Sequence, residues 1–585
     1  MRAVFRKLLL FIPALLLLAS CQTRKAVIGH EAVPNRAFNN NLSSNWLAAA
    51  RAALPEKYFE KGDLSFQEIT NLLCRESRRG NIEAQGLWGC ALLLQSSSPK
   101  ETEVGLQLLR KSADEGYVAA MVTLGFLYEG GQYVPKDYKE VFHWFSMAAA
   151  KGDAEAQNHV GGCYCYGLGT TQDYSMAAKY YRRSADNTNY AAMKSLGFLL
   201  MRGYGVDKNL DAAKYWLTRA AKEGGNRRAM YNLGALCSRR ISDPNSIIQA
   251  FQWYQQSAEL GDPLACFELA QYYYYGWGVQ RDLDRYRTWR FKAATLGATE
   301  AQFQMGSAYR TGDGVPKDIE TSLMWYLKAA AKNHPKAFYD LAVHYLEDKT
   351  NEASLKLAHY YMLRAAQTGC REAQFQCALS CFRGDLGTPD CEGGKQWLGQ
   401  AAENGCPRAE FCLYELFYYG IAPATNCPPY RKDRAEAIKW LRRAAEHEIL
   451  QAQAILAFML MQGKEMEPNK AEAEKLLRNA AEHGCGQAQN DLGFAILNGD
   501  ISTTNVVEAA KWCRLAVSSL TDPEKLSRAK VNLSNALSRL TEDQRLEADR
   551  QVDSFKALPV ADIDPMSKGW EENPAYKQED GQLIH

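Results

Sequence analysis

A pattern of about 36 residues that recurs along most of the chain constrains the fold more than any other feature. In residues 301–334, apolar and small residues follow Ala301 at helical spacing, which predicts one buried stripe. Gly312 predicts the end of this helix, because glycine readily adopts the positive φ of a helix-ending turn. Asp318 is placed to cap a second helix that carries Trp325 on its inner stripe. The unit is therefore a helix hairpin, and neither helix can bury its stripe alone.

The same hairpin restarts at a series of alanines, which we call the anchor alanines. Nine of the twelve intervals between them are 36 residues, and the others are 37, 43 and 41. A fixed period of this length is typical of a helical solenoid, in which each hairpin buries its face against its neighbours. The anchor alanines are Ala84, Ala120, Ala156, Ala192, Ala229, Ala265, Ala301, Ala337, Ala373, Ala409, Ala452, Ala488 and Ala529. Eight tryptophans share one phase of the second helix and are predicted to be core residues: Trp144, Trp216, Trp253, Trp289, Trp325, Trp397, Trp440 and Trp512.

Within the repeats, the motif A-x3-L-G-x2-Y-x2-G-x-G-V-x2-D, followed by W and A-A, recurs in phase. One repeat matches it at Ala120, Leu124, Gly125, Tyr128, Gly131, Val134, Asp137, Trp144, Ala148 and Ala149. This motif resembles the Sel1-like repeat, a relative of the tetratricopeptide repeat. The resemblance implies an all-α fold, a right-handed superhelical solenoid of about twelve helix hairpins with capping helices. It also implies an adaptor that binds other proteins.

The N-terminus predicts an export signal that ends in a lipid attachment site. Three basic residues precede an apolar core, residues 8–18, which is too short to span a bilayer permanently. The segment ends Leu-Ala-Ser-Cys and resembles the lipobox of bacterial lipoproteins, in which the cysteine, here Cys21, is lipidated after removal of the signal peptide. An ordinary signal peptide with a chance cysteine is the alternative. Gln22 favours, by resemblance, an outer membrane location facing the periplasm.

Composition shifts along the chain predict how the repeats are flanked. The expected organisation is a signal peptide in 1–20, a flexible linker in 21–44, an N-terminal capping hairpin in 45–80, the repeat solenoid in 81–520, C-terminal capping helices in 521–557 and a disordered tail in 558–585. The longer turn at residues 420–433 is a partner-binding loop or a neutral insertion, and the insertion is the favoured interpretation.

Charge and motifs argue against a nucleic-acid partner and against catalysis. The formal net charge is +2, and removal of the leader with its three basic residues lowers it to about −1, whereas a nucleic-acid binder needs a basic face. No complete set of catalytic motifs and no dinucleotide fingerprint occurs. We therefore expect no enzyme activity, no cofactor and no metal site.

Sixteen cysteines are compatible with disulfides in an exported chain. Seven lie between Cys370 and Cys427, and Cys391 shares its phase in the inter-helix turns with Cys427. Some Sel1-like proteins carry one disulfide per repeat. Here the spacing varies, so the sequence leaves the connectivity open.

Six consecutive repeats carry an aromatic residue two positions after the anchor alanine, a series we call the aromatic ladder. This offset lies about 200° round the helix from the anchor. The ladder either packs between repeats, which is the favoured interpretation, or lines a groove for a peptide or amphipathic helix of a partner. Its members are Tyr231, Phe267, Phe303, Tyr339, Phe375 and Phe411.

Together these patterns predict a membrane-tethered, non-catalytic scaffold or adaptor in a bacterial cell envelope. Its partners would be other proteins, and the N-terminal lipid would provide the contact with the membrane. Two alternatives stay open: a cell-wall-related enzyme or β-lactam-binding Sel1-like protein, and a surface-displayed factor that interacts with host proteins.

Overall fold

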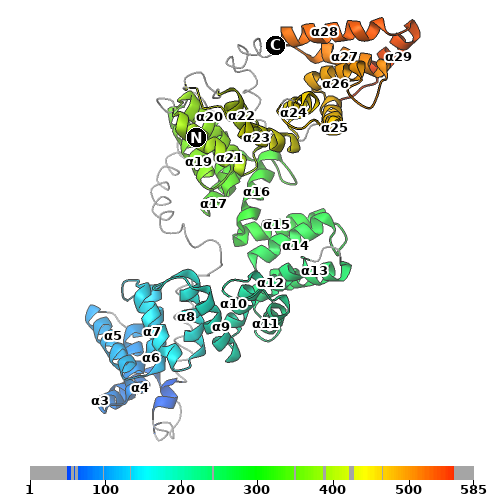
Figure 1. Ribbon diagram of the computed structural model, residues 1–585. Coiled ribbons are helices and arrows are strands. Elements are labelled where there is room, and N and C mark those ends of the chain that lie inside the picture. Colours follow the sequence, from blue (N-terminus) through cyan, green and yellow to red (C-terminus); the bar gives the residue numbers. More distant parts are fainter. Residues whose placement is uncertain are drawn as a thin grey trace. The chain divides into compact units, whose positions relative to one another are not determined.

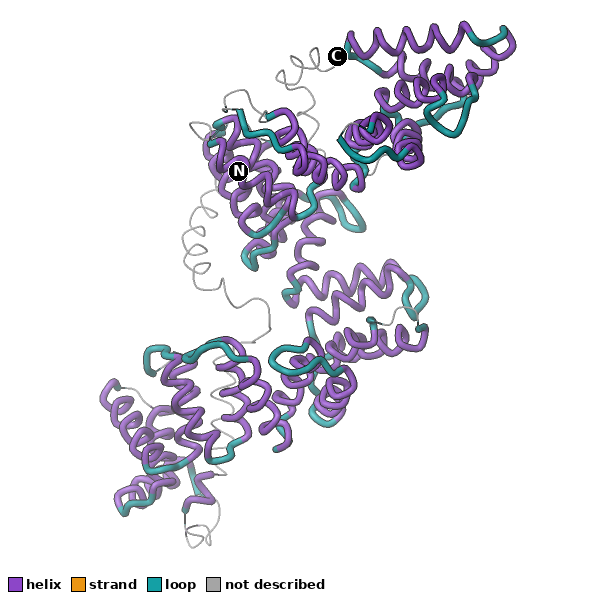
Figure 2. Tube along the Cα trace, in the orientation of Figure 1, coloured by secondary structure: helices purple, strands orange, loops and turns teal. Residues whose placement is uncertain are grey.

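The computed structural model describes residues 49–54, 58, 64–95, 98–131, 133–239, 243–347, 351–385, 390–420, 427, 429–463 and 465–558. These residues form helices joined by turns, with no strand among them (Figure 1 and Figure 2). The chain divides into two compact units, residues 1–325 and 326–585, and the boundary falls within one helix, α17. The two units are described separately.

The helices of the first unit are α3 (Phe66–Arg78), α4 (Ile82–Gln95), α5 (Pro99–Asp114), α6 (Val118–Gly130), α7 (Tyr138–Ala150), α8 (Ala154–Tyr166), α9 (Tyr174–Asp186), α10 (Tyr190–Arg202), α11 (Leu210–Lys222), α12 (Arg227–Cys237), α13 (Pro244–Glu259), α14 (Pro263–Tyr275), α15 (Leu283–Leu296) and α16 (Thr299–Thr311). After α17 (Ile319–Ala330), the second unit contains α18 (Pro335–Leu346), α19 (Glu352–Gln367), α20 (Arg371–Arg383), α21 (Cys391–Glu403), α22 (Pro407–Tyr419), α23 (Arg434–Glu446), α24 (Leu450–Gln462), α25 (Lys470–Glu482), α26 (Gly486–Asn498), α27 (Val506–Ser519), α28 (Pro523–Ser538) and α29 (Glu542–Asp553).

Consecutive helices pair into hairpins, as the 36-residue period predicts. The helix α10 packs against its partner α11 and also against α9 of the preceding hairpin, and this alternation runs from α4 to α15 and again from α18 to α27. Every anchor alanine is at most 1% exposed, because its small side chain lets two helices approach closely. The all-α solenoid of helix hairpins is confirmed.

The turns within the hairpins form where the glycines predict them. Gly312 follows α16 with a φ of 86°, in the left-handed region that glycine adopts without strain. Asp318 then starts α17, since its Oδ1 accepts hydrogen bonds from the backbone N–H groups of Glu320 at 3.0 Å and Thr321 at 3.2 Å. The aspartate therefore satisfies donors that a helix N-terminus leaves without an intrahelical partner.

A glutamine directly after the anchor alanine ties successive hairpins together. In α20, Gln374 Nε2 donates to the backbone carbonyl of Ala366 at 3.1 Å, in the last turn of α19. Because the last carbonyls of a helix have no intrahelical donor, the buried amide satisfies one of them and holds the next hairpin in place. Four other glutamines make the same bond to the residue eight positions earlier: Gln157, Gln302, Gln453 and Gln489.

The tryptophans follow the predicted phase but do not all reach the core. Trp144, Trp216, Trp325, Trp440 and Trp512 are buried, whereas Trp253, Trp289 and Trp397 are only half-buried. The prediction that all eight are core residues is therefore wrong for three of them. These three pack at the edge of the core clusters, and Lys292 Nζ lies 4.4 Å from the ring centre of Trp289, so a cation covers that ring.

The last repeat is followed by two further helices. The helix α29 packs on α27, and the segment after α29 folds back, so that Leu558 N–H donates to the carbonyl of Glu482 at 2.9 Å. At the other end, residues 49–53 are helical and precede α3. The predicted signal peptide, Cys21, the linker and the tail from residue 559 lie outside the described residues. None of the described helices is long and apolar enough to cross a membrane.

Candidate binding surface

The aromatic ladder is divided between the two units. In the first unit Tyr231 on α12, Phe267 on α14 and Phe303 on α16 are half-buried. In the second unit Tyr339 on α18, Phe375 on α20 and Phe411 on α22 are buried, with exposed fractions of 9%, 3% and 5%. Phe375 and Phe411 belong to a hydrophobic core cluster, so their rings contribute to packing between repeats. Docking of a partner on the half-buried rings of the first unit stays a prediction.

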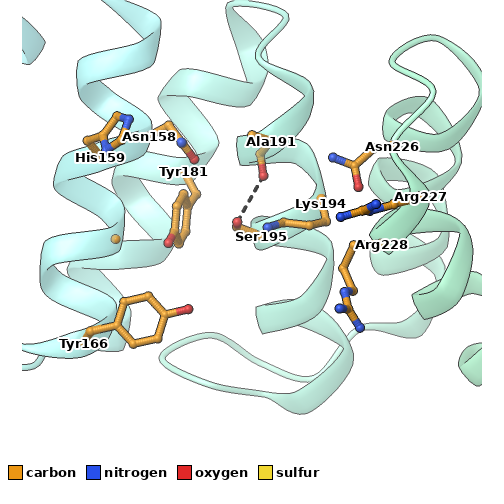
Figure 3. Close-up of a pocket in the computed structure, with 11 residues that line it drawn as sticks. Asn158, His159, Tyr166, Tyr181, Ala191, Lys194, Ser195, Asn226, Arg227 and Arg228 are labelled. Carbon is orange, nitrogen blue, oxygen red and sulfur yellow. Dashed lines mark hydrogen bonds between the residues drawn. The ribbon is translucent and has the colours of Figure 1, made fainter. Parts of the chain in front are cut away.

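A pocket of about 270 Å³ lies on the first helices of three successive hairpins in the first unit. It is formed by α8, α10 and α12, with one ring from α9 (Figure 3). Two of its residues, Asn158 and Lys194, stand two positions after an anchor alanine, which is the offset of the ladder. The lining residues are Asn158, His159, Gly162, Tyr166, Tyr181, Ala191, Lys194, Ser195, Asn226, Arg227 and Arg228.

Three basic side chains line the side of the pocket that α10 and α12 provide, and none of the eleven lining residues is acidic. Arg228 is held in place by Asp262, whose Oδ2 lies 3.2 Å from the arginine Nε, and its guanidinium lies 5.3 Å from the ring centre of Tyr231. Asp262 is buried, and burial raises the pKa of its carboxyl group although the positive charge of Arg228 lowers it. The ion pair fixes the direction of Arg228 at the pocket.

The opposite side of the pocket is lined by aromatic rings. His159 stacks on Phe145 with ring centres 4.4 Å apart, and its Nδ1 lies 4.0 Å from Glu129 Oε2. Burial raises the pKa of Tyr166 and of Tyr181, so both phenols stay protonated near neutral pH. A protonated phenol is a hydrogen-bond donor, and Figure 3 shows the Tyr166 hydroxyl directed towards the side of the pocket formed by α10 and α12.

A disulfide fixes the longer turn at residues 420–433. Cys427 is bonded to Cys391, the first residue of α21, 36 positions earlier. Tyr430 adds two hydrogen bonds, one from its hydroxyl to the carbonyl of Cys391 at 2.6 Å and one from its N–H to the carbonyl of Gly420 at 2.8 Å. The disulfide joins the two cysteines that share a phase in the sequence. Residues 421–426 and 428 lie outside the described part of the chain.

The sequence analysis did not single out the pocket, although its components were visible. Asn226, Arg227 and Arg228 directly precede the anchor alanine Ala229, and Lys194 stands two residues after the anchor alanine Ala192. Their convergence depends on the packing of α8, α10 and α12, which the period alone does not specify. In the part of the chain that the structure describes, no three His, Cys, Asp or Glu side chains group to hold a metal ion.

A family model described as the Sel1 repeat matches the chain twelve times between residues 82 and 519. The chain belongs to the Sel1 repeat family. Proteins built from these repeats are generally protein-interaction scaffolds or regulators, and the solenoid is typically non-catalytic. The matched segments are residues 82–117, 118–153, 154–189, 191–225, 227–262, 263–297, 299–334, 335–370, 371–406, 412–448, 450–485 and 486–519.

Several individual proteins are similar to parts of this chain. The uncharacterized protein NMB1327 of Neisseria meningitidis is 27% identical over 274 residues, which are 42% of this chain and 56% of that protein. The chitin synthase regulator SKT5 of Saccharomyces cerevisiae is 28% identical over 235 residues, 37% of this chain and 32% of the relative. The chain thus spans only about half, or less, of the length of these curated relatives.

Two solved structures of repeat proteins also align with it. The protective antigen c5321 of uropathogenic Escherichia coli is 26% identical with a TM-score of 0.48, and the alignment covers 86% of this chain and 100% of that one. A Sel1 repeat protein from Oxalobacter formigenes is 30% identical with a TM-score of 0.38, covering 42% of this chain and 96% of that one.

Proposed function

We propose that this protein is a lipid-anchored scaffold that binds other proteins in a bacterial cell envelope. The observation that carries the proposal is the run of twelve Sel1 repeats. In each repeat the first helix of the hairpin occupies the same place, so similar helix surfaces recur along the chain. A surface of this kind suits extended protein segments, since neighbouring repeats can each contribute a contact. The scaffold would act by holding its partners together, without catalysis.

Two features support an envelope location. The sequence Leu-Ala-Ser-Cys after an apolar core resembles a lipobox, and acyl chains at Cys21 would retain the chain at a membrane, at about 0.8 kcal/mol per buried CH₂. The disulfide between Cys391 and Cys427 suits an oxidising compartment outside the cytosol. Gln22 favours the periplasmic face of the outer membrane. A membrane tether would raise the effective concentration of partners that reside at the same surface.

The tether is tested by replacing the proposed lipidated residue. We expect the wild-type chain, expressed in its native envelope, to sediment with membranes and to incorporate labelled palmitate. The Cys21→Ser variant should lose the label and leave the membrane fraction, whereas a Cys74→Ser control should behave like the wild type. A Cys21→Ser chain that still sediments with membranes and still carries label would refute lipidation at this site.

The scaffold itself is tested by photo-crosslinking in the same envelope. A benzophenone amino acid at Phe303, on the half-buried part of the ladder, is compared with one at Lys328, on the outer side of α17. A recurrent protein adduct at Phe303 that is absent at Lys328 would support docking on the first helices. If mass spectrometry found only crosslinks within the chain from Phe303 and no adduct with another protein, the scaffold proposal would fail.

A further inference from the structure

Three cations line the pocket on α8, α10 and α12, and two of them stand at the N-terminus of a helix. Arg227 and Arg228 occupy the first two positions of α12, which Asn226 caps by accepting the N–H of Ala229 at 3.0 Å. A helix N-terminus carries partial positive charge, so cations there are unfavourable and acidic residues are preferred. The first turn of α12 contains no acidic residue. Contacts within the fold hold the two arginines at this place, because Arg227 Nη1 donates to the carbonyl of Leu260 at 3.4 Å and Arg228 pairs with Asp262.

We propose that this pocket binds a carboxylate side chain in an acidic segment of a protein partner. Lys194, Arg227 and Arg228 would neutralise the carboxylate, and arginine offers two parallel N–H groups to its two oxygens. The proposal rests on the scaffold function above and deepens it, because it names the chemistry of the partner.

The polar groups around the three cations suit the same ligand. The Tyr166 hydroxyl and the side-chain amides of Asn158 and Asn226 can donate hydrogen bonds to a carboxylate. The Ser195 hydroxyl instead donates a hydrogen bond to the carbonyl of Ala191, at 3.0 Å. This bond fixes the hydroxyl at the pocket wall. Two carboxylates that contact lining residues already have partners there, Asp262 with Arg228 and Glu129 with His159.

The shape of the site favours a peptide over a small metabolite. Its volume of about 270 Å³ lies below the range of about 300–1,000 Å³ that is usual for small-molecule sites, and it suits one or two side chains. The same surface continues along α12 to Tyr231, whose ring lies beside Arg228 and could contact an apolar neighbour of the bound acid. Burial raises the pKa of the Tyr231 phenol, and the negative charge of Glu268 on α14 raises it further.

The proposal is tested with a peptide array and the full chain in detergent. The array presents short random peptides in which one fixed central residue is glutamate or glutamine. We expect binding to a subset of glutamate peptides and about tenfold or more weaker binding to the matched glutamine peptides. The strongest binder, labelled with fluorescein, is then measured by fluorescence anisotropy against the variants.

Charge-matched variants distinguish binding in the pocket from non-specific electrostatic attraction between the peptide and the whole chain. Lys194→Gln with Arg227→Gln should weaken the labelled peptide by about tenfold or more, because it removes two cations from the site. Lys179→Gln with Lys214→Gln removes the same charge from exposed positions on the second helices and should change the affinity by about twofold or less. The Lys194→Arg variant keeps the positive charge and should retain binding. If it does, the loss of affinity in the Gln variants follows the charge and not a general intolerance of substitution at this position.

Three results would overturn the assignment. The first is equally tight binding of glutamine and glutamate peptides as classes. The second is a loss of affinity in the control variant as large as that in the pocket variant. The third is displacement of the peptide by free citrate at a concentration near the peptide's own Kd. The last result would make the ligand a small anion. If the pocket fails these tests while protein adducts still form at Phe303, the scaffold function stands and only the acidic ligand is wrong.

Discussion

At the scale of single residues, Glu410 and Arg443 form a charged version of a pair that another repeat builds from amides. In that repeat Gln453 donates to the carbonyl of Ala445 at 3.0 Å and accepts from Asn479 at 2.9 Å. In the charged version, Arg443 Nη2 takes over the bond to the preceding helix, donating to the carbonyl of Ala402 at 2.9 Å, and lies 3.0 Å from Glu410 Oε1. The glutamate is fully buried and also lies 2.7 Å from His447 Nδ1.

The two residues should therefore be replaceable together but not separately. Arg443→Asn should destabilise the fold by about 2–4 kcal/mol, because it leaves a buried carboxylate without its main cation. Adding Glu410→Gln to that variant restores the amide pair and should return the stability to within about 1 kcal/mol of the wild type. Urea denaturation of the single and double variants measures this coupling. Additive losses in the double variant would contradict it.

Asp491 on α26 gives a pH dependence of known sign. Burial raises the pKa of its carboxyl group to about 6, although Gln487 and Asn490 donate hydrogen bonds to it and Lys525 lies near. Because the fold favours the protonated acid, the stability from this group is complete below about pH 4 and is lost as the pH rises through 6.

Asp491→Asn should remove this dependence. At pH 8 the variant should be more stable than the wild type by about 1–2 kcal/mol, and at pH 4 the two should be nearly equal, because the wild-type acid is then also neutral. Thermal melts across this pH range provide the measurement. The exposed Asp500→Asn change is the control and should shift the melt little at either pH. A variant less stable than the wild type at pH 8 would refute the assignment.

At the scale of the hairpin, two glycines in one turn carry different constraints. Gly203 ends α10 with a φ of 78°, and the nearest atom to a Cβ there would be the Cβ of Lys208 at 3.3 Å, with the Lys208 backbone N at 3.6 Å. Gly205 has a φ of 67°, and a Cβ there would lie 2.2 Å from the backbone carbon of Tyr174 at the start of α9. The second glycine therefore permits contact between neighbouring hairpins as well as the turn itself.

Alanine substitutions should separate these two roles. Gly203→Ala should cost about 1 kcal/mol, the usual penalty for a side chain at positive φ. Gly205→Ala should cost about 3 kcal/mol or more, since the backbone of α9 must also move. Chemical denaturation of the two variants gives the comparison. Equal losses would show that only the turn conformation matters.

The hairpins could be predicted from the sequence because their determinants are local and repeat in phase. Anchor alanines, turn glycines such as Gly312 and helix caps such as Asp318 each act within a few residues, and the structure places them as the period predicts. The depth of individual tryptophans is not local. Trp289 is only half-buried, and Lys292, one turn later on α15, lies against its ring.

The basic pocket could not be predicted in the same way. Lys194 and Arg228 belong to different repeats, and their convergence depends on how α10 and α12 pack on either side of the intervening α11. The position two residues after the anchor alanine is aromatic in six repeats and non-aromatic in the other seven, so a lysine there gave no signal by itself. Cys391 and Cys427 occupy the same position in two successive repeats, but the sequence alone did not predict that they form a disulfide.

At the scale of the whole molecule, a repeat array should respond locally to damage, because each hairpin contacts mainly its neighbours. The final helix α29 covers α27: Ala548 is fully buried, Asp549 pairs with Arg514, and beyond the helix Phe555 meets Trp512 edge-on at 5.5 Å. Removing α29 would expose the apolar end of the array. The loss of stability should be confined to the repeats that pack next to this end of the array.

Deleting residues 541–585 should therefore increase backbone hydrogen exchange in α25, α26 and α27, measured by mass spectrometry, while α6 to α11 exchange as in the wild type. The expected change is about tenfold or more in the terminal repeats, since local opening there loses the contacts that α29 provides. Deleting only residues 559–585 leaves α29 and its contacts in place and serves as the control. Equal acceleration in α6 to α11 would mean that the chain unfolds as a single cooperative body, and nearest-neighbour coupling would then not describe it.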